Sequence, residues 1–266
     1  MNKHLLLIFV FTNIFISGCI FDEEKRESIS MGLSPKSMFE LAQTNIDGGS
    51  IDEAIIVYNK LQAAYPASKY AIQAKLETIY QLYKRDKFDE GIDKINEYLK
   101  IYPDHFTTPY ALYLRGVIAE NKSKSILDDF NITDNAQRDV SSVKNALNFY
   151  LDLIKKYPNS KYSSEAKNKL IILRNLLSRH ELFIAIFYYK QEAFIASINR
   201  CKYIIEKFPN TPSVPASLHL IAQNYDKINA PKLAEDARRV LKSSYPKYTP
   251  HYSLDDWCTK LSASSL

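Results

Sequence analysis

The sequence predicts an all-α fold of about five helix-turn-helix repeats, which amounts to about ten helices. Three observations carry this prediction. An aromatic residue followed by proline recurs at intervals of 37, 55, 51 and 37 residues, small and apolar residues keep a fixed distance from each proline, and helix start and stop signals flank the first repeat. The aromatic-proline pairs are Tyr65-Pro66, Tyr102-Pro103, Tyr157-Pro158, Phe208-Pro209 and Tyr245-Pro246.

The residues around each proline keep the same register. Twelve residues before each of the five prolines is a small residue: Ala54, Gly91, Ala146, Ser197 and Ala234. Five before is an apolar one: Leu61, Tyr98, Leu153, Ile204 and Leu241. Eight after the first four prolines is another small residue: Ala74, Ala111, Ala166 and Ser217. Small residues let two helix backbones approach, and proline ends a helix because it lacks the N–H and clashes with the preceding turn. Each repeat is therefore predicted to be an antiparallel pair of helices.

The first hairpin carries the clearest local signals. Ser34-Pro35 supplies an N-cap and a first-turn proline, Gly48-Gly49 marks the turn, and Ser50 with two carboxylates opens the second helix. The predicted helices span 35–47, 51–65, 68–84, 88–101, 108–121, 141–157, 160–178, 192–208, 213–227 and 231–245. The polar stretch 122–140 is predicted to be an inserted loop, and 182–190 to be additional helix.

The N-terminus is predicted to be an export signal that ends at a lipidated cysteine. Lys3 precedes a short apolar run, and Ile16-Ser17-Gly18-Cys19 resembles the bacterial lipobox, in which the cysteine is acylated and cleavage occurs before it. Residues 1–18 are then the signal peptide, 19–34 the lipidated Cys19 and a flexible tether, 35–246 the repeat domain and 247–266 a tail. The alternative is an ordinary signal peptide with a chance cysteine.

Composition and motifs exclude several function classes. The formal net charge is +5, and both signs are interspersed without the clustered basic face of a nucleic-acid-binding protein. HExxH, GxxxxGK, GxSxG and paired CxxC motifs are absent, and the histidines share no ligand spacing, so we expect no enzyme activity, no metal and no cofactor. Cys201 is predicted to be a small buried hydrophobe, although a bridge to Cys258 is conceivable in an oxidising compartment.

The repeat itself resembles the tetratricopeptide repeat, whose helix pairs stack into a solenoid. The order of features along most of the chain further resembles the BamD family of outer-membrane β-barrel assembly lipoproteins. The supporting segments are the lipobox at Cys19, Phe39-Glu40-Leu41-Ala42, Gln137-Arg138-Asp139, Tyr157 to Tyr162 leading into Lys169-Leu170, Phe187-Tyr188-Tyr189 and Phe194 to Arg200. The tail from Tyr248 to Leu266, which contains Trp257, departs from this resemblance and takes no function from it.

The resemblance implies a lipid-anchored protein of the outer membrane that faces the periplasm. Its implied partners are unfolded outer-membrane proteins, the periplasmic repeats of the barrel-type assembly protein and other assembly lipoproteins. A groove for barrel strands should offer aromatic faces and amide donors. The candidate groove residues are Phe39, Gln43, Tyr70, Gln73, Tyr80, Tyr83 and Tyr110, although tyrosines at helical spacing also serve as interhelical core.

The candidate contact with the assembly protein lies in the C-terminal repeats. Asn199, Arg200 and Lys202 are proposed as a polar hot spot, because arginine is favoured at interface centres. The alternative interpretation of these residues is a solvated helix face. An alternative function for the whole chain is a repeat lipoprotein that tethers enzymes of cell-wall synthesis or division.

Overall fold

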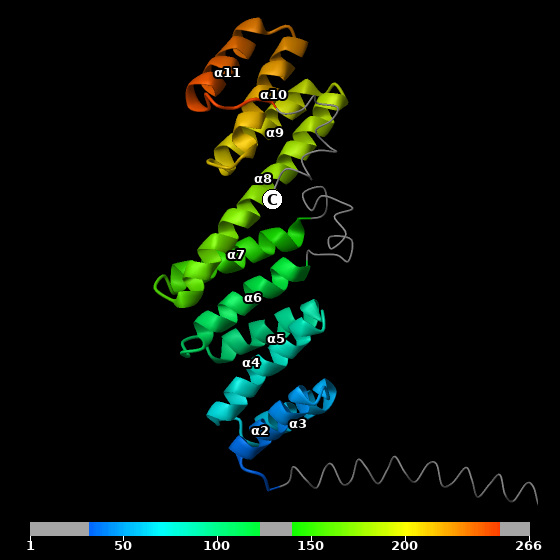
Figure 1. Cartoon of the computed structure of the whole chain (residues 1–266), viewed down its shortest axis with the longest axis vertical. Helices are drawn as coiled ribbons and strands as arrows, with labels where there is room; N and C mark the ends of the chain where they lie inside the picture. Colours follow the sequence, from blue (N-terminus) through cyan, green and yellow to red (C-terminus); the bar gives the residue numbers. More distant parts are fainter. Residues whose placement is uncertain (1–31, 123–139, 251–266) are drawn as a thin grey trace, which may run out of the picture. The chain divides into compact units, whose positions relative to one another are not determined.

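A computed structural model describes residues 32–122 and 140–250, where every regular element is an α-helix (Figure 1). These ranges hold ten helices and no strand, which confirms the predicted all-α fold of tetratricopeptide-like hairpins. The chain divides after Lys87 into two compact units. The predicted signal peptide, Cys19, the inserted loop and most of the tail lie outside the described residues.

The first unit contains three helices, α2 (Pro35–Asp47), α3 (Ile51–Ala64) and α4 (Lys69–Lys84). α2 begins as predicted: Oγ of Ser34 accepts a hydrogen bond from the N–H of Ser37 at 3.1 Å, and Pro35 occupies the first turn. The turn into α3 uses Gly49 with φ of 81°, a left-handed conformation that glycine adopts without a steric penalty. Ser50 occupies the N-cap position of α3 as predicted, but its side chain makes no capping hydrogen bond.

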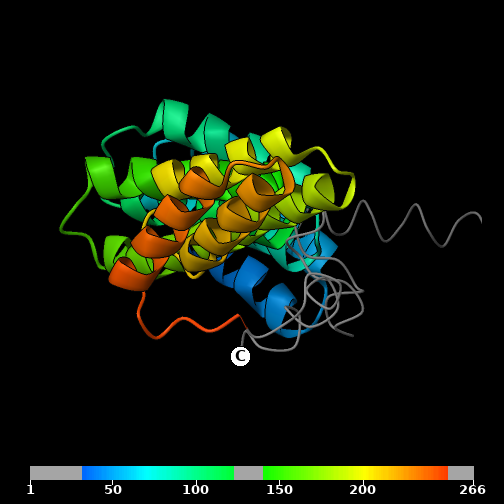
Figure 2. The same cartoon turned by 90° about the horizontal axis from the view of Figure 1, so that it is seen from above.

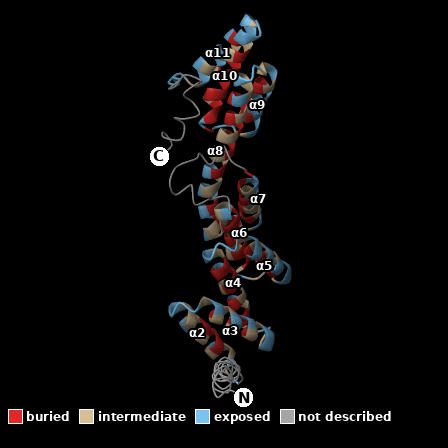
Figure 3. Ribbon diagram, turned by 90° about the vertical axis from the view of Figure 1, so that its right-hand side faces the viewer, coloured by how far each residue is buried: buried red, intermediate tan, exposed pale blue. Residues whose placement is uncertain are grey.

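The core of the first unit lies where its three helices meet. α2 pairs with α3, and α4 contacts both. Four of the eight buried residues in this core are alanines, whose small side chains leave room for the larger ones to interdigitate. The buried set is Met38, Phe39, Ala42, Ala54, Tyr58, Leu61, Ala71 and Ala74 (red in Figure 3).

The second unit contains the other seven helices. They are α5 (Phe88–Ile101), α6 (Thr108–Lys122), α7 (Ser141–Lys156), α8 (Lys161–Lys190), α9 (Phe194–Lys207), α10 (Ser213–Lys227) and α11 (Pro231–Ser244). Each helix contacts the next one along the chain, and α8 also contacts α6 and α10. The last pair, α10 and α11, lies side by side in both views (orange to red in Figures 1 and 2).

α8 differs from the prediction in one respect. The additional helix expected over 182–190 is confirmed, but α8 runs without a break for 30 residues instead of ending near residue 178. Its second half is stabilised because Leu182, Ala185 and Ile186 are buried in the same cluster as residues of α9 and α10. A continuous helix is therefore held by packing beyond the point where the repeat pattern alone would end it.

The small residues that keep a fixed distance from each proline are buried in the structure. All five small residues before the prolines and all four after them are buried. The aromatic residue before proline ends the second helix of each repeat: Tyr157, for example, has φ of -132° and ψ of 61°, and its N–H still bonds to the carbonyl of Leu153 at 2.8 Å. This backbone lies outside the helical region, which a following proline disfavours for the residue before it.

Candidate functional site

Two of the predicted groove residues, Phe39 and Gln43, make contacts within the core of the first unit. The ring of Phe39 lies 5.5 Å from Tyr58 and 5.9 Å from Tyr70, centroid to centroid, and its side chain is almost fully buried. Gln43 donates a hydrogen bond from Nε2 to the hydroxyl of Tyr58. Burial raises the pKa of Tyr58, and the nearby charge of Glu77 adds to the rise. The structure favours the core alternative for Phe39 and Gln43.

The accessible part of the predicted groove lies on α4. Gln73 is exposed, and Tyr80 is 37% exposed with its ring centroid 6.0 Å from that of the half-buried Tyr83. Gln73, Glu77 and Tyr80 recur at the i, i+4, i+7 spacing of one helix face, and we call these three residues the α4 row. Burial raises the pKa of the Glu77 carboxyl. The row therefore offers an amide, a carboxyl and a phenol to a ligand.

Glu77 was missed by the sequence analysis, which considered only aromatic and amide side chains. Its position midway between Gln73 and Tyr80 was the available signal, since residues four and three apart on a helix are neighbours.

Tyr110, the last groove candidate, belongs to the second unit and joins a tyrosine cluster there. Its ring lies 5.5 Å from Tyr162 on α8, and Tyr113 stacks on the same ring at 5.6 Å. Nζ of Lys161 lies 4.9 Å from the centroid of Tyr162. All three tyrosines are half-buried, so each has one part in the packing between α6 and α8 and another part in solvent.

Of the three residues predicted to contact a partner on α9, Arg200 forms an ion pair within the chain, and Asn199 and Lys202 are exposed. Nη1 of Arg200 donates a hydrogen bond to Oε2 of Glu181 at 2.9 Å, so the guanidinium holds α9 to α8. Asn199 and Lys202 are exposed. Ile195 and Tyr203 are also exposed and share a helix face with Asn199. We call Ile195, Asn199, Lys202 and Tyr203 the α9 face.

Ile195 and Tyr203 were missed by the sequence analysis, although their spacing of four from Asn199 on either side was visible. Exposed apolar side chains beside polar ones are the composition of protein interfaces, in which aromatic residues are enriched. The α9 face therefore offers more than the polar hot spot that the sequence predicted.

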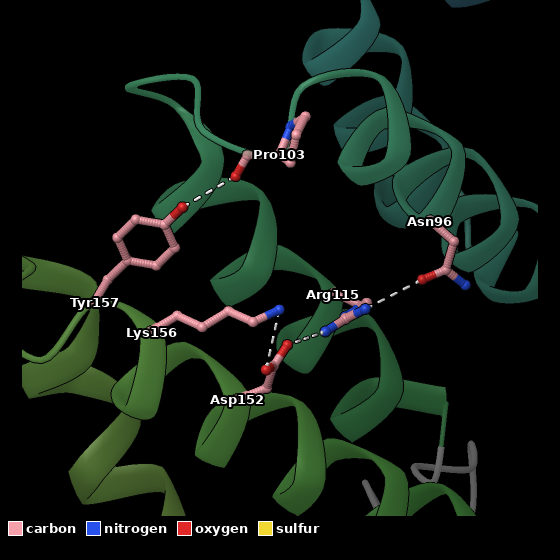
Figure 4. Close-up of polar contacts among 6 residues, drawn as sticks. All are labelled: Asn96, Pro103, Arg115, Asp152, Lys156 and Tyr157. Atoms are coloured by element: carbon pink, nitrogen blue, oxygen red, sulfur yellow. Dashed lines mark hydrogen bonds and ion pairs between the residues drawn. The ribbon is translucent and has the colours of Figure 1, made fainter.

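A polar network inside the second unit was also missed, and it has a positioning role (Figure 4). Arg115 on α6 donates to Asn96 on α5 at 3.3 Å and to Asp152 on α7 at 3.0 Å, while Phe149 lies under its guanidinium at 4.2 Å. Burial lowers the pKa of Arg115, and the charge of Asp152 opposes that shift. One side chain thus joins three successive helices.

The turns at the ends of the repeats are linked to one another as well. The hydroxyl of Tyr157, in the aromatic-proline pair after α7, donates to the carbonyl of Pro103 at 3.1 Å (Figure 4). This contact fixes the spacing between consecutive repeats, which in turn sets where side chains on their surfaces lie.

The described residues hold no candidate centre for metal chemistry. Within 32–122 and 140–250 no group of three or more His, Cys, Asp or Glu side chains could hold a metal ion. In the same ranges no helix is both long enough and apolar enough to cross a membrane. Cys201 is buried, as predicted, and burial raises the pKa of its thiol to about 12. Cys19 and the pairing question for Cys258 lie outside the described residues.

The helices of this chain pair into hairpins, and a proline recurs at the same place in each repeat. Together with the surface rows of mixed polar and aromatic side chains, these features define a tetratricopeptide-type repeat protein. Residues 31–241 match the YfiO family, whose description is "Outer membrane lipoprotein". The chain belongs to this family.

Curated relatives match nearly the whole chain. The Outer membrane protein assembly factor BamD of Neisseria gonorrhoeae is 32% identical over 244 residues, which cover 91% of each chain. The protein of the same name from Xylella fastidiosa (strain Temecula1 / ATCC 700964) is 29% identical over 245 residues, 92% of this chain and 83% of its own. Among solved structures, the TPR2AB domain of yeast Sti1 aligns with a TM-score of 0.45 and 10% identity, over 80% of this chain and 78% of that one.

Proposed function

We propose that the chain is a non-catalytic scaffold for the assembly of outer-membrane β-barrel proteins. In this proposal Cys19 carries a lipid that anchors the chain to the outer membrane, and the repeats face the periplasm. The observation that carries it is family membership over 31–241, together with relatives named outer membrane protein assembly factor that match along nine-tenths of this chain. A scaffold needs surfaces and no bond chemistry, which agrees with the helical-repeat fold.

The α4 row is the proposed surface for unfolded outer-membrane proteins. Barrel strands alternate apolar and polar residues, and before folding their backbone N–H and C=O groups are unpaired. The Gln73 amide both donates and accepts hydrogen bonds, the Tyr80 ring covers an apolar side chain, and the Glu77 carboxyl is kept closer to its neutral form by burial. Tyr83 packs against Tyr80 of the row, and Phe39 packs against Tyr70 at the start of the same helix, while Gln43 is held by Tyr58. Tyr110 offers a second aromatic surface in the other unit.

The α9 face is the proposed surface for the periplasmic repeats of the barrel-type assembly protein and for other assembly lipoproteins. Ile195 and Tyr203 supply apolar area, and Asn199 and Lys202 supply hydrogen-bond donors between them. Arg200 contributes by holding α9 against Glu181 on α8, and 42% of its side chain remains exposed. Binding energy at such interfaces concentrates in a few aromatic and arginine residues.

The direct test is a gentle-detergent pull-down of the tagged full chain from its own cells, with the partners identified by mass spectrometry. The proposal predicts recovery of a barrel-type outer-membrane assembly protein in amounts comparable with the bait. Recovery of cell-wall synthesis or division enzymes without that protein would overturn it in favour of the tethering function.

A further inference from the structure

The aromatic-proline turns of the second unit gather along one edge of it. The turns α5–α6, α7–α8 and α9–α10 and the end of α11 all lie on its left side in Figure 1. Contacts join neighbouring turns: the hydroxyl of Tyr157 donates to the carbonyl of Pro103, and Phe208 packs in the same cluster as Tyr157. We call the exposed residues within four positions of Pro103, Pro158, Pro209 and Pro246 the turn edge.

Cations outnumber carboxylates on the turn edge. Glu206 is already paired with Lys207 at 2.6 Å, and Lys156 is paired with Asp152 at 3.3 Å, one turn inside the edge. The remaining lysines of the edge form no ion pair with another described residue. The charged members of the edge are Lys100, Lys155, Lys156, Lys161, Lys207, Lys242 and Lys247 against Asp104 and Glu206.

The opposite edge of the second unit has no such excess among its described residues. Exposed charges of both signs are mixed there, and Lys122 pairs with Asp89. The described charges of that edge are Lys122, Lys144, Lys190, Lys227 and Lys232 with Asp89, Glu90, Glu192 and Asp226. The fold therefore brings together on one edge lysines that are dispersed along the sequence.

Helix stability explains only part of this charge. Lys100, Lys155 and Lys242 stand in the last turns of their helices, where a cation interacts favourably with the helix dipole. Lys161 is the first residue of α8, where the dipole disfavours a cation. Lys247 follows the end of α11. The edge thus carries cations that no helix end requires.

The turn edge also exposes two apolar side chains. Phe106, in the turn α5–α6, is 86% exposed, and Ile101 at the end of α5 is 50% exposed. The hairpin does not require apolar residues there: Lys156 and Lys207 occupy the place of Ile101 relative to the next prolines, and Lys161 occupies that of Phe106. Phe106 and Ile101 therefore face outward, in the same direction as the lysines around them.

The choice of lysine over arginine indicates what this edge contacts. Protein interfaces are enriched in arginine and depleted in lysine. The turn edge contains no arginine, and arginines elsewhere in the unit are paired with carboxylates: Arg115 with Asp152, Arg200 with Glu181 and Arg238 with Asp226. Lysine is a flexible point charge that needs no fixed partner geometry, which suits the many phosphates of an anionic lipid surface. Exposed aromatic and aliphatic side chains beside lysines add apolar contact at the headgroup boundary.

We propose that the turn edge lies on a membrane surface that contains anionic phospholipid, with Phe106 and Ile101 inserted among the headgroups. The proposal rests on the proposed anchor at Cys19 only for bringing the chain to a membrane. An acyl anchor and a basic surface reinforce each other, because the anchor raises the effective concentration of the second contact. The contact orients the second unit with its turn edge toward the lipid.

The test is quenching of a tryptophan by brominated lipid. Trp257, the only tryptophan of the chain, is replaced by phenylalanine, and Phe106→Trp then places a single tryptophan on the turn edge. The chain purified from membranes is reconstituted on vesicles of equal parts phosphatidylcholine and phosphatidylglycerol. The matched control is Phe187→Trp, because Phe187 is also an exposed phenylalanine, 59% exposed, and lies in the last turn of α8 at the opposite edge. We expect several-fold stronger quenching at position 106 than at position 187.

Charge is tested in the same assay. Quenching at position 106 should fall to the level of position 187 on vesicles of phosphatidylcholine alone, and also when Lys100→Glu and Lys155→Glu are combined. Lys190→Glu, at the opposite edge, should leave it unchanged, and circular dichroism should show every variant folded.

Equal quenching at positions 106 and 187 on the anionic vesicles would overturn the proposal and leave the edge to an acidic protein partner. Quenching at position 106 that persists without anionic lipid, or after both charge reversals, would also overturn it. Because only the chain and lipid are present, either result leaves the proposed assembly function unaffected.

Discussion

Arg200 on α9 and Glu181 on α8 form an ion pair in which the carboxylate is far more buried than the guanidinium. Nη1 of Arg200 lies 2.9 Å from Oε2 of Glu181, and the side-chain exposures are 42% and 9%. Removing the arginine would leave a buried carboxylate without its cation, which is costlier than losing a surface pair. Arg200 therefore has a structural role, and a binding experiment must separate the loss of stability in an Arg200 variant from a loss of partner contacts.

We expect Arg200→Gln to lower the free energy of unfolding by about 2 kcal/mol, because a buried charge loses its partner while the exposure of the arginine reduces the effect. Urea denaturation measures it. Glu181→Gln combined with Arg200→Gln should recover part of the loss. Lys202→Gln, on the exposed side of the same helix, is the control and should change stability by less than about 0.5 kcal/mol. An Arg200→Gln effect no larger than the control would contradict the structural role.

Gly116 on α6 lies directly against the ring of Tyr150 on α7. A Cβ at this position would lie 2.4 Å from Cε1 of Tyr150, a ring that is fully buried and held by a hydrogen bond to Glu120. We expect Gly116→Ala to lower the unfolding free energy by about 2 kcal/mol, despite the better helix propensity of alanine.

Gly91→Ala is the matched control for that substitution. The added Cβ would come nearest to Cδ1 of Ile118 at 3.3 Å, the end of a flexible side chain, and would meet Cγ2 of the same residue at an ordinary 3.8 Å. It should cost clearly less than Gly116→Ala in the same thermal or urea experiment. Equal effects at both glycines would argue against the tight approach at Tyr150.

Cys201 should be unreactive while the chain is folded. Burial raises the pKa of its thiol to about 12, with a smaller opposing effect from the hydrogen bond with Ser217, so almost no thiolate is present at pH 8. In a chain carrying Cys19→Ser and Cys258→Ser, a thiol reagent should label Cys201 only in denaturant. Labelling within minutes under native conditions would show that the α9–α10 core opens readily.

Acid should destabilise the second unit through His219. Burial lowers the pKa of its imidazole, and the charge of Arg238 lowers it further. Between the lowered pKa and the ordinary value near 6.5, the unfolded chain binds more protons than the folded chain. Stability is therefore complete above about pH 6.5 and falls as the pH drops below it. Unfolding free energies measured from pH 7.5 to 5 should decline less in His219→Asn, and an identical decline would exclude this histidine as a source.

The helix hairpins could be predicted because their determinants are local. A proline after an aromatic residue ends a helix wherever it occurs, and the predicted ranges 35–47, 88–101 and 213–227 agree with α2, α5 and α10. The end of α8 could not be predicted in the same way. Its last turns are held by contacts of Leu182 and Ile186 with α9 and α10, which no repeat spacing encodes.

The candidate surfaces could be predicted only in part. Tyrosine and phenylalanine at helical spacing serve equally in a core or a groove, so the sequence could not separate the buried Phe39 from the exposed part of Tyr80. The Arg115 network joins residues from three helices and has no sequence signature. Ile195 and Tyr203 could have been predicted as part of this surface, because their spacing of four residues from Asn199 places all three on one helix face.

The most direct test of the scaffold proposal places a photocrosslinking amino acid at exposed amide positions in living cells. Gln73 in the α4 row is compared with Asn59, an exposed amide on α3, and Asn199 in the α9 face with Asn168, an exposed amide on α8. The account predicts crosslinks from position 73 to unfolded outer-membrane proteins and from position 199 to a barrel-type assembly protein, with neither from the controls. Equal crosslinking at test and control positions, or capture of cell-wall enzymes at 199, would contradict it.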